Sequence, residues 1–166
     1  DDLSHDETRS TVDLIMDLTK KLHDKGKPTE ILTVDNHADG PYLYLRLLKE
    51  NPKRAEEVLE LLKMNEGNSS GIGIGCISWD GEVYADQFWR HYSFGNIKKR
   101  PFSEIWTDTS EPLMKKLKKK KKYVTGKCAT CRWLDICAGN FRVRAEALGD
   151  LWMPDPACYL TDEEIS

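Results

Sequence analysis

The sequence predicts a mixed α/β protein, in which the last helix, strand and helix elements of a partial TIM-type barrel precede a small cysteine-rich lobe with a β-hairpin and short helices. Three observations support this expectation. Residues 1–67 combine helical apolar periodicity with one β-prone run, a glycine- and serine-rich stretch begins at Asn68, and four of the five cysteines follow residue 127. We therefore expect two domains, residues 1–67 and residues 68–166.

The first expected element is an amphipathic helix. Residues 4–7 have the Ser-x-x-Glu form of a capping box, and apolar side chains then recur at helical spacing until Gly26 ends the run. Residues 30–34 are β-prone and predict a short strand. The polar loop 35–40 follows that strand.

Two further helices are expected next. Residues 41–48 are mostly apolar, which predicts a buried helix, and Asn51 with Pro52 supplies a cap and a first-turn proline for the following one. The order helix, strand, helix, helix suits the last portion of a parallel α/β barrel or open sheet better than a free-standing fold.

The second part begins with a hairpin signal. Asp80 and Gly81 lie between the β-prone runs 76–79 and 82–84, and Asp-Gly in that position is typical of a tight hairpin turn. Short helices are predicted at residues 101–106 and 111–121. From residue 125 onward, the sequence is rich in cysteine and glycine and shows no apolar periodicity.

The charge distribution limits the partners of the chain. The formal net charge is −3, yet lysines occupy seven of the eight positions 115–122. Such a block is usually a solvated helix face, and the alternative is a patch that attracts an anionic partner or a polycarboxylate substrate. The overall charge argues against a nucleic-acid binder, and neither a membrane-spanning run nor a signal peptide is present in the sequence. We expect a cytoplasmic protein without a membrane partner, and, because the chain starts without Met, native residues preceding Asp1.

The cysteines point to a metal centre. Cys128 and Cys131 form a Cys-x-x-Cys turn, Cys137 follows shortly after, and Cys158 lies far enough away to close the site. Thiolates suit soft metals, and an odd cysteine number fits poorly with a disulfide framework. The three-plus-one grouping differs from the paired knuckles of zinc sites, but spacing alone leaves zinc and an iron–sulfur cluster nearly even.

Four other side chains are candidates for chemistry. His37 is a catalytic candidate because the loop after a barrel strand carries active-site residues. Arg90 and His91, after the hairpin, are candidates for contacts to substrate carboxylates. Arg132 lies among the cysteines, where a cation would tune a bound cluster.

Cys76 and several aromatic residues have two interpretations each. Cys76 is either a small buried apolar side chain or a ligand on the substrate side. The aromatic residues form either core packing or a flat wall against a macrocycle; they are Tyr42, Tyr44, Trp79, Phe88 and Trp89.

Three segments carry a family resemblance. The stretches GEVYADQFW, GKCATCRWLDICAGNFRVRA and DPACYL resemble the SPASM/twitch-type C-terminal extension of radical S-adenosylmethionine (SAM) enzymes. Within that superfamily the chain is similar to the branch that trims side chains from siroheme-derived tetrapyrroles, the didecarboxysiroheme deacetylases and haem d1 biosynthesis proteins. The resemblance implies removal of acetate or propionate side chains from an iron tetrapyrrole, with a ferredoxin or flavodoxin as electron donor.

The resemblance also implies a cofactor. Full SPASM domains hold two auxiliary clusters, but Asp86 and Phe141 stand here in place of two of the cysteines. One auxiliary [4Fe-4S] cluster is therefore implied, and its expected ligands are Cys128, Cys131, Cys137 and Cys158.

One motif of the superfamily is missing from the sequence. The Cys-x-x-x-Cys-x-x-Cys motif, whose cluster binds SAM, does not occur in residues 1–166. SAM and a second [4Fe-4S] cluster are expected only in a longer parent, and the chain alone is expected to be inactive. A zinc-stapled interaction module and the auxiliary lobe of a peptide-modifying radical SAM enzyme remain the alternatives.

Overall fold

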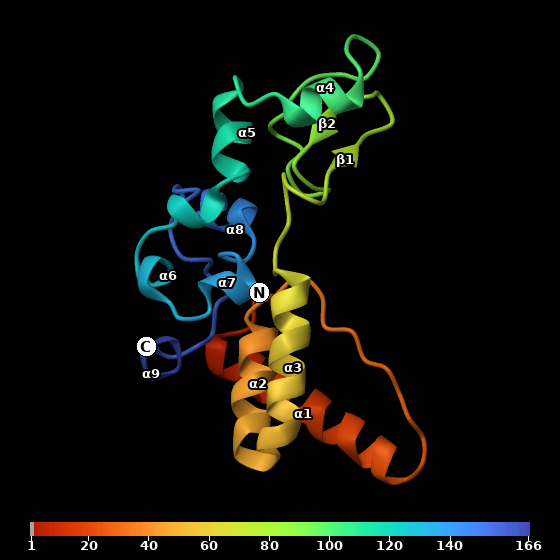
Figure 1. Cartoon of the computed structure of the whole chain (residues 1–166), viewed down its shortest axis with the longest axis vertical. Coiled ribbons are helices and arrows are strands. Elements are labelled where there is room, and N and C mark those ends of the chain that lie inside the picture. Colours follow the sequence, from red (N-terminus) through yellow and green to blue (C-terminus); the bar gives the residue numbers. More distant parts are fainter. Residues whose placement is uncertain (1) are drawn as a thin grey trace.

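The computed structural model describes residues 2–166. Figure 1 shows an elongated molecule with the longer helices at one end and a small sheet at the other. The short helices of the C-terminal segment lie between these two ends (Figure 1). The cysteine-rich segment is thus placed where both ends of the molecule contact it.

The helical end consists of α1 (His5–Asp24), α2 (Asp39–Glu50) and α3 (Pro52–Asn65). The predicted capping box is confirmed, since the Ser4 side chain accepts from the Glu7 backbone and the Glu7 side chain accepts in return. The predicted cap of α3 is also confirmed, because the Asn51 side chain accepts from the Arg54 backbone. Helices α2 and α3 pack side by side, as Figure 1 shows.

The strand predicted at residues 30–34 is not formed. Residues 27–34 have no regular structure, and Leu32 and Val34 are 76% and 72% exposed. A single β-prone run forms a strand only where a neighbouring strand accepts its hydrogen bonds. Within residues 2–166 the sole sheet is the distant hairpin, so this run has no partner. Helix α2 also differs from expectation, since only Pro41 and Tyr42 of it are buried.

The predicted hairpin is confirmed. Strands β1 (Cys76–Ile77) and β2 (Val83–Tyr84) are antiparallel, with Cys76 opposite Tyr84, and Gly81 takes the positive φ of 94° that the turn requires. Helix α4 (Phe102–Thr107) follows as expected. The helix expected at 111–121 is divided into α5 (Pro112–Leu117) and the 3₁₀ turn η1 (Lys120–Lys122).

The C-terminal segment holds α6 (Lys127–Thr130), α7 (Leu134–Cys137), α8 (Arg142–Ala147) and α9 (Asp162–Ile165). It shares a buried cluster with the helical end, here called the first core: Val12, Ala38, Tyr42, Trp133, Ile136, Tyr159, Leu160 and Ile165. A second core surrounds the hairpin: Val83, Ala85, Trp89, Phe94, Ile105, Met114 and Leu117. The domain boundary at residue 68 stays a prediction.

No helix within residues 2–166 is both long and apolar enough to cross a membrane.

Candidate metal centre

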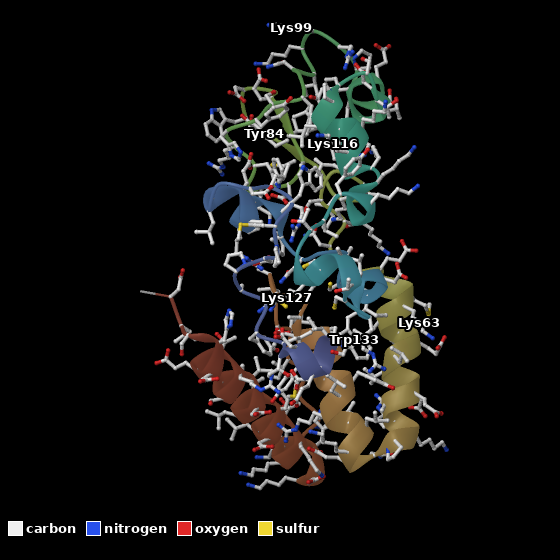
Figure 2. The ribbon with its side chains drawn as sticks, turned by 90° about the vertical axis from the view of Figure 1, so that its left-hand side faces the viewer. Lys63, Tyr84, Lys99, Lys116, Lys127 and Trp133 are labelled. Carbon is white, nitrogen blue, oxygen red and sulfur yellow. The ribbon has the colours of Figure 1, made fainter. Side chains whose placement is uncertain are left out.

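The structure brings four cysteines to one cavity. Cys128, Cys131, Cys137 and Cys158 all line it, and each is a free thiol. Lys127 and Trp133, which flank the first two, lie in the middle of the molecule, away from Tyr84 and Lys99 of the hairpin end (Figure 2). Cys76 is half-buried in β1 and does not line this cavity.

Local backbone geometry sets the direction of two of these thiols. Cys137 ends α7, and the next three residues, 138–140, all have positive φ, between 52° and 77°. This sharp reversal turns the Gly139 N–H back to donate to the Sγ of Cys137 at 3.4 Å. Similarly, the N–H of Trp133 donates to the Sγ of Cys131 at 3.4 Å. Such donors favour the thiolate form of a cysteine.

The fourth cysteine is placed by the buried carboxylate of Asp155. Its Oδ1 accepts from the N–H of Ala157 at 2.8 Å, and its Oδ2 accepts from the N–H of Phe141 at 2.9 Å. The N–H of Cys158 donates to the Asp155 carbonyl at 3.0 Å, which closes the turn. The Asp-Pro-Ala-Cys sequence is therefore a turn that directs Cys158 toward the other three cysteines.

Burial sets the protonation of these thiols. Desolvation raises the pKa of Cys137 to about 12 and also raises the pKa values of Cys128 and Cys131. Thiolates in this cavity consequently need a positive partner, such as a metal, to offset the loss of hydration.

The four thiols share one cavity. Across residues 2–166, no group of three or more His, Cys, Asp or Glu side chains is already arranged to hold one metal ion.

Two buried cations lie beside this cavity, and the sequence predicted neither. Lys120 is 1% exposed, so the solvated-face interpretation of the lysine block is wrong for this residue. Its Nζ donates to the Asn68 carbonyl and, at 2.5 Å, to the Asn68 Oδ1. Burial lowers the pKa of Lys120 to about 7. Arg142 is also 1% exposed.

Arg132, the predicted tuning cation, does not line the cavity, and neither do Lys120 and Arg142. The guanidinium of Arg132 lies over the ring of Trp133 and donates to the carbonyl of Ser166. Arg132 was predicted because it is adjacent to a cysteine in the sequence. That criterion could not identify Arg142, which follows the positive-φ turn. A cation placed directly after such a turn is the feature that sequence reasoning overlooked.

His37 lines a second cavity of about 280 Å³ together with Asp86 and Phe141. Its ring stacks on that of Phe141, with centroids 5.5 Å apart. Burial, followed by the charge of Lys120, lowers the pKa of His37, which favours the neutral imidazole. Asp86 is buried and accepts hydrogen bonds from Ser70 and from the Phe88 backbone.

The other candidates lie elsewhere. His91 is paired with Glu146 at 2.8 Å on the surface, and Arg90 lies exposed near the ring of Trp79. Neither lines the cysteine cavity or the His37 cavity. The aromatic residues do not form one wall, since Tyr42 belongs to the first core and Trp89 to the second.

The C-terminal segment of this helical scaffold thus surrounds a cavity lined by four free thiols, the donor type that suits soft metals. Residues 73–132 match the SPASM family, described as an iron-sulfur cluster-binding domain. The chain therefore belongs to the SPASM-domain radical SAM proteins, and the resemblance stated from the sequence is confirmed. The matched range contains Cys128 and Cys131 and ends before Cys137.

Three curated relatives extend this result. The chain is 68% identical over 169 residues to Fe-coproporphyrin III synthase of Methanosarcina barkeri (strain Fusaro / DSM 804), covering 99% of this chain and 42% of that protein. It is 38% identical to pre-heme d1 synthase of Dinoroseobacter shibae (strain DSM 16493 / NCIMB 14021 / DFL 12), covering 99% and 41%. It is 30% identical over 123 residues to AdoMet-dependent heme synthase of the same Methanosarcina strain, covering 69% and 33%. No solved structure matches the chain.

Proposed function

We propose that this chain is the auxiliary-cluster portion of a radical SAM enzyme that removes acetate or propionate side chains from a siroheme-derived tetrapyrrole in haem or haem d1 biosynthesis. The observation that carries the proposal is the four-thiol cavity in a chain that aligns over 99% of its length with two tetrapyrrole synthases. The chain spans about two fifths of the length of those relatives.

The proposed cofactor is one [4Fe-4S] cluster, and its proposed ligands are Cys128, Cys131, Cys137 and Cys158. Support comes from the chemistry of the donors, which line one cavity, and from the match of residues 73–132 to an iron-sulfur cluster-binding domain. The backbone donors at Gly139 and Trp133 add the N–H···S contacts that stabilise thiolate ligands. When bound, such a cluster supplies one-electron transfer and a structural anchor.

Residues 1–67 are proposed to be the last part of a TIM-type barrel, and residues 68–166 the SPASM-like lobe. The exposed run 31–34 supports this, because it is apolar, β-prone and unpaired, as a barrel strand is when its neighbours are not present. SAM and a second [4Fe-4S] cluster belong, in this proposal, to a longer parent, and the chain alone is inactive. A cytoplasmic location and a ferredoxin or flavodoxin donor complete the proposal.

His37 is the residue proposed to face the substrate. It lies where the His37 cavity meets the groove between α1, α2 and α3, and its backbone N–H is fixed by the Asn140 side chain at 3.0 Å. A neutral imidazole in that position offers a nitrogen to the substrate. Arg90 is proposed as a carboxylate contact because it is exposed, whereas His91 is already paired with Glu146.

Metal analysis of anaerobically purified protein tests the cofactor. We expect brown protein with about four irons and matching sulfide per chain, and visible absorption that bleaches with dithionite. Colourless protein with one zinc per chain would contradict the cluster and favour the zinc-stapled module.

The substrate is tested by binding to the iron-loaded chain. We expect an iron tetrapyrrole that carries acetate side chains to bind more tightly than a peptide of equal charge. We expect His37→Gln to weaken that binding and to leave the iron content unchanged. Equal binding of the peptide would contradict the tetrapyrrole assignment.

A further inference from the structure

Arg142 and Lys120 are buried cations that lie behind the lining of the cysteine cavity. Arg142 donates to the carbonyl of Gly139, which lines the cavity, and Lys120 donates to Asn68, whose N–H donates to the Cys137 carbonyl. Arg142 begins α8 and Lys120 begins η1, and each is 1% exposed. Neither forms an ion pair with a carboxylate within residues 2–166. An unpaired buried charge is costly, so a fold that keeps two of them near each other favours a compensating negative group.

The guanidinium of Arg142 is held by backbone oxygens alone. Its Nη1 donates to the carbonyls of Met153 at 2.6 Å and Leu151 at 3.2 Å, and its Nη2 donates to the carbonyl of Gly139. Carbonyl acceptors orient the group but do not neutralise its charge. The positive charge is therefore fixed in place and remains available to another partner.

One N–H group of Arg142 has no hydrogen-bond acceptor in the described part of the chain. This group is the buried Nε–H. A buried donor without an acceptor destabilises a fold, and each such case calls for a missing partner. Gly139 brings the backbone close to this atom, since a Cβ there would lie 3.5 Å from Nε and 3.1 Å from Val124.

The thiols are the negative groups next to these cations. Burial lowers the pKa of Arg142, and the charges of Cys128, Asp155 and Cys137 oppose that shift, with Cys128 first among them. Asp155 already pairs with Arg144, whereas Lys127, which lines the cavity, and the exposed Arg132 both favour the thiolate form of Cys131. For Lys120, Asp86 and Cys137 are the groups that favour the charged form.

Charge balance shows what the two cations offset. Four thiolates around an oxidised [4Fe-4S] core leave an excess of about two negative charges, and one-electron reduction adds another. The two buried cations oppose this excess, together with Lys127, which lines the cavity. They also stabilise the reduced state more strongly than the oxidised state, because the attraction grows with the added electron.

We propose that Arg142 and Lys120 are the internal counter-charges of the four-cysteine centre, that the free Nε–H of Arg142 serves a sulfur of this site, and that together they raise its reduction potential. This inference rests on the proposed function, since it requires the four cysteines to hold a cluster. Both are positioning residues in the sense that they act through the cluster.

The test compares four variants of the iron-loaded chain by redox titration with dithionite and by the electron paramagnetic resonance spectrum of the reduced protein. Arg142→Gln and Lys120→Gln remove one buried charge each, Arg142→Lys retains the charge, and Arg132→Gln removes an exposed charge adjacent to Cys131. We expect both buried-charge variants to keep iron and to have more negative midpoint potentials, with an altered spectrum for Arg142→Gln. Arg132→Gln and Arg142→Lys should stay near the wild-type potential.

Each alternative outcome has a defined meaning. Iron-loaded Arg142→Gln or Lys120→Gln at the wild-type potential, or Arg132→Gln with an equal shift, would overturn the proposal. If both Gln variants at the buried positions lose iron, retention of iron by Arg142→Lys supports the charge role, and loss of iron by that variant overturns it. A wild-type chain that binds zinc and no iron would instead refute the proposed function, before any variant is compared.

Discussion

Arg144 donates to both oxygens of the Asp155 carboxylate, from Nε at 3.0 Å to Oδ1 and from Nη2 at 2.9 Å to Oδ2. The same guanidinium donates through Nη1 to the carbonyl of Asp35 at 2.6 Å. One arginine of α8 thereby joins the loop that carries His37 to the turn that carries Cys158. The two candidate cavities are connected through this ion pair.

Removing the Asp155 charge should destabilise the chain. Asp155 is buried and paired, so Asp155→Asn leaves Arg144 without its counter-charge and weakens the turn before Cys158. We expect a loss of about 3 kcal/mol in the free energy of unfolding, measured by urea denaturation of the metal-free chain. Asp135→Asn is the matched control: it breaks the exposed Lys121–Asp135 pair and should cost less than about 1 kcal/mol. Equal losses would contradict the role of Asp155.

Gly67 is required for the contact between α3 and the cysteine segment. Its φ is 67°, and a Cβ there would lie 2.4 Å from the carbonyl oxygen of Ile136 and 2.5 Å from the carbonyl carbon of Cys137. We expect Gly67→Ala to lower the free energy of unfolding by about 3 kcal/mol or more, because backbone must move. Thermal and urea unfolding of the metal-free chain measure this.

Gly26 provides the control for Gly67. Its φ is 69°, nearly the same, but a Cβ there would meet nothing within 4 Å. Gly26→Ala should therefore show only the backbone cost of about 1 kcal/mol. The difference in the free energy of unfolding between the two variants measures the steric cost at Gly67. If the two losses were equal, the packing of α3 would not depend on this close approach.

The local elements were predictable from the sequence, because their signals are local. The capping box at Ser4, the Asn51 cap and the Asp80-Gly81 turn all satisfy hydrogen bonds within a few residues. The run 30–34 was predicted wrongly as a strand, because strand formation depends on a neighbour that these residues lack.

Of the residues at the candidate site, only the cysteines could be predicted from the sequence. Their grouping follows from spacing, whereas the burial of Lys120 does not, since it resembles the six other lysines of its block. Arg142 and Asp155 act through contacts to backbone that is distant along the chain or bent by positive φ. Such contacts exist only after folding, so no local sequence pattern predicts them.

Cysteine substitution separates the ligands from Cys76. We expect Cys137→Ser to abolish most iron binding, because this thiol lines the cysteine cavity and is fixed by the Gly139 N–H. Cys76→Ser should keep the wild-type iron content, since Cys76 lies in β1, outside that cavity. Iron and sulfide analysis after anaerobic reconstitution gives the readout. The same loss of iron in both proteins would place Cys76 among the ligands.

Acid should weaken the contact between the two ends of the chain. The hydrogen bond from Arg9 lowers the pKa of Glu164, so the folded state holds this proton less tightly than the unfolded state. Stability from the pair is then fully present above the unfolded pKa of about 4.3 and is lost as pH falls through the lower folded value. Glu164→Gln should cost about 1 kcal/mol at pH 7 and almost nothing near pH 2 in urea titrations.

Glu163→Gln is the control for this pH dependence. Glu163 lies on the same helix, is exposed and forms no ion pair within residues 2–166. Its substitution should change stability by less than about 0.5 kcal/mol at both pH values. A pH-independent cost for Glu164→Gln would mean that its capping contact to Thr161, and not its charge, is what stabilises the fold.

The contacts between the N-terminal helix and the C-terminal segment have a consequence for biogenesis. Arg9 bonds to Glu164 and His5 to the Pro156 carbonyl, partners more than 150 positions apart in sequence. Contacts of that separation form late, because the intervening chain must first be brought together. During synthesis the three earlier thiols leave the ribosome before Cys158, so the proposed four-cysteine site is complete only after this segment has been translated. A carrier that arrives sooner would meet an open, three-thiol site.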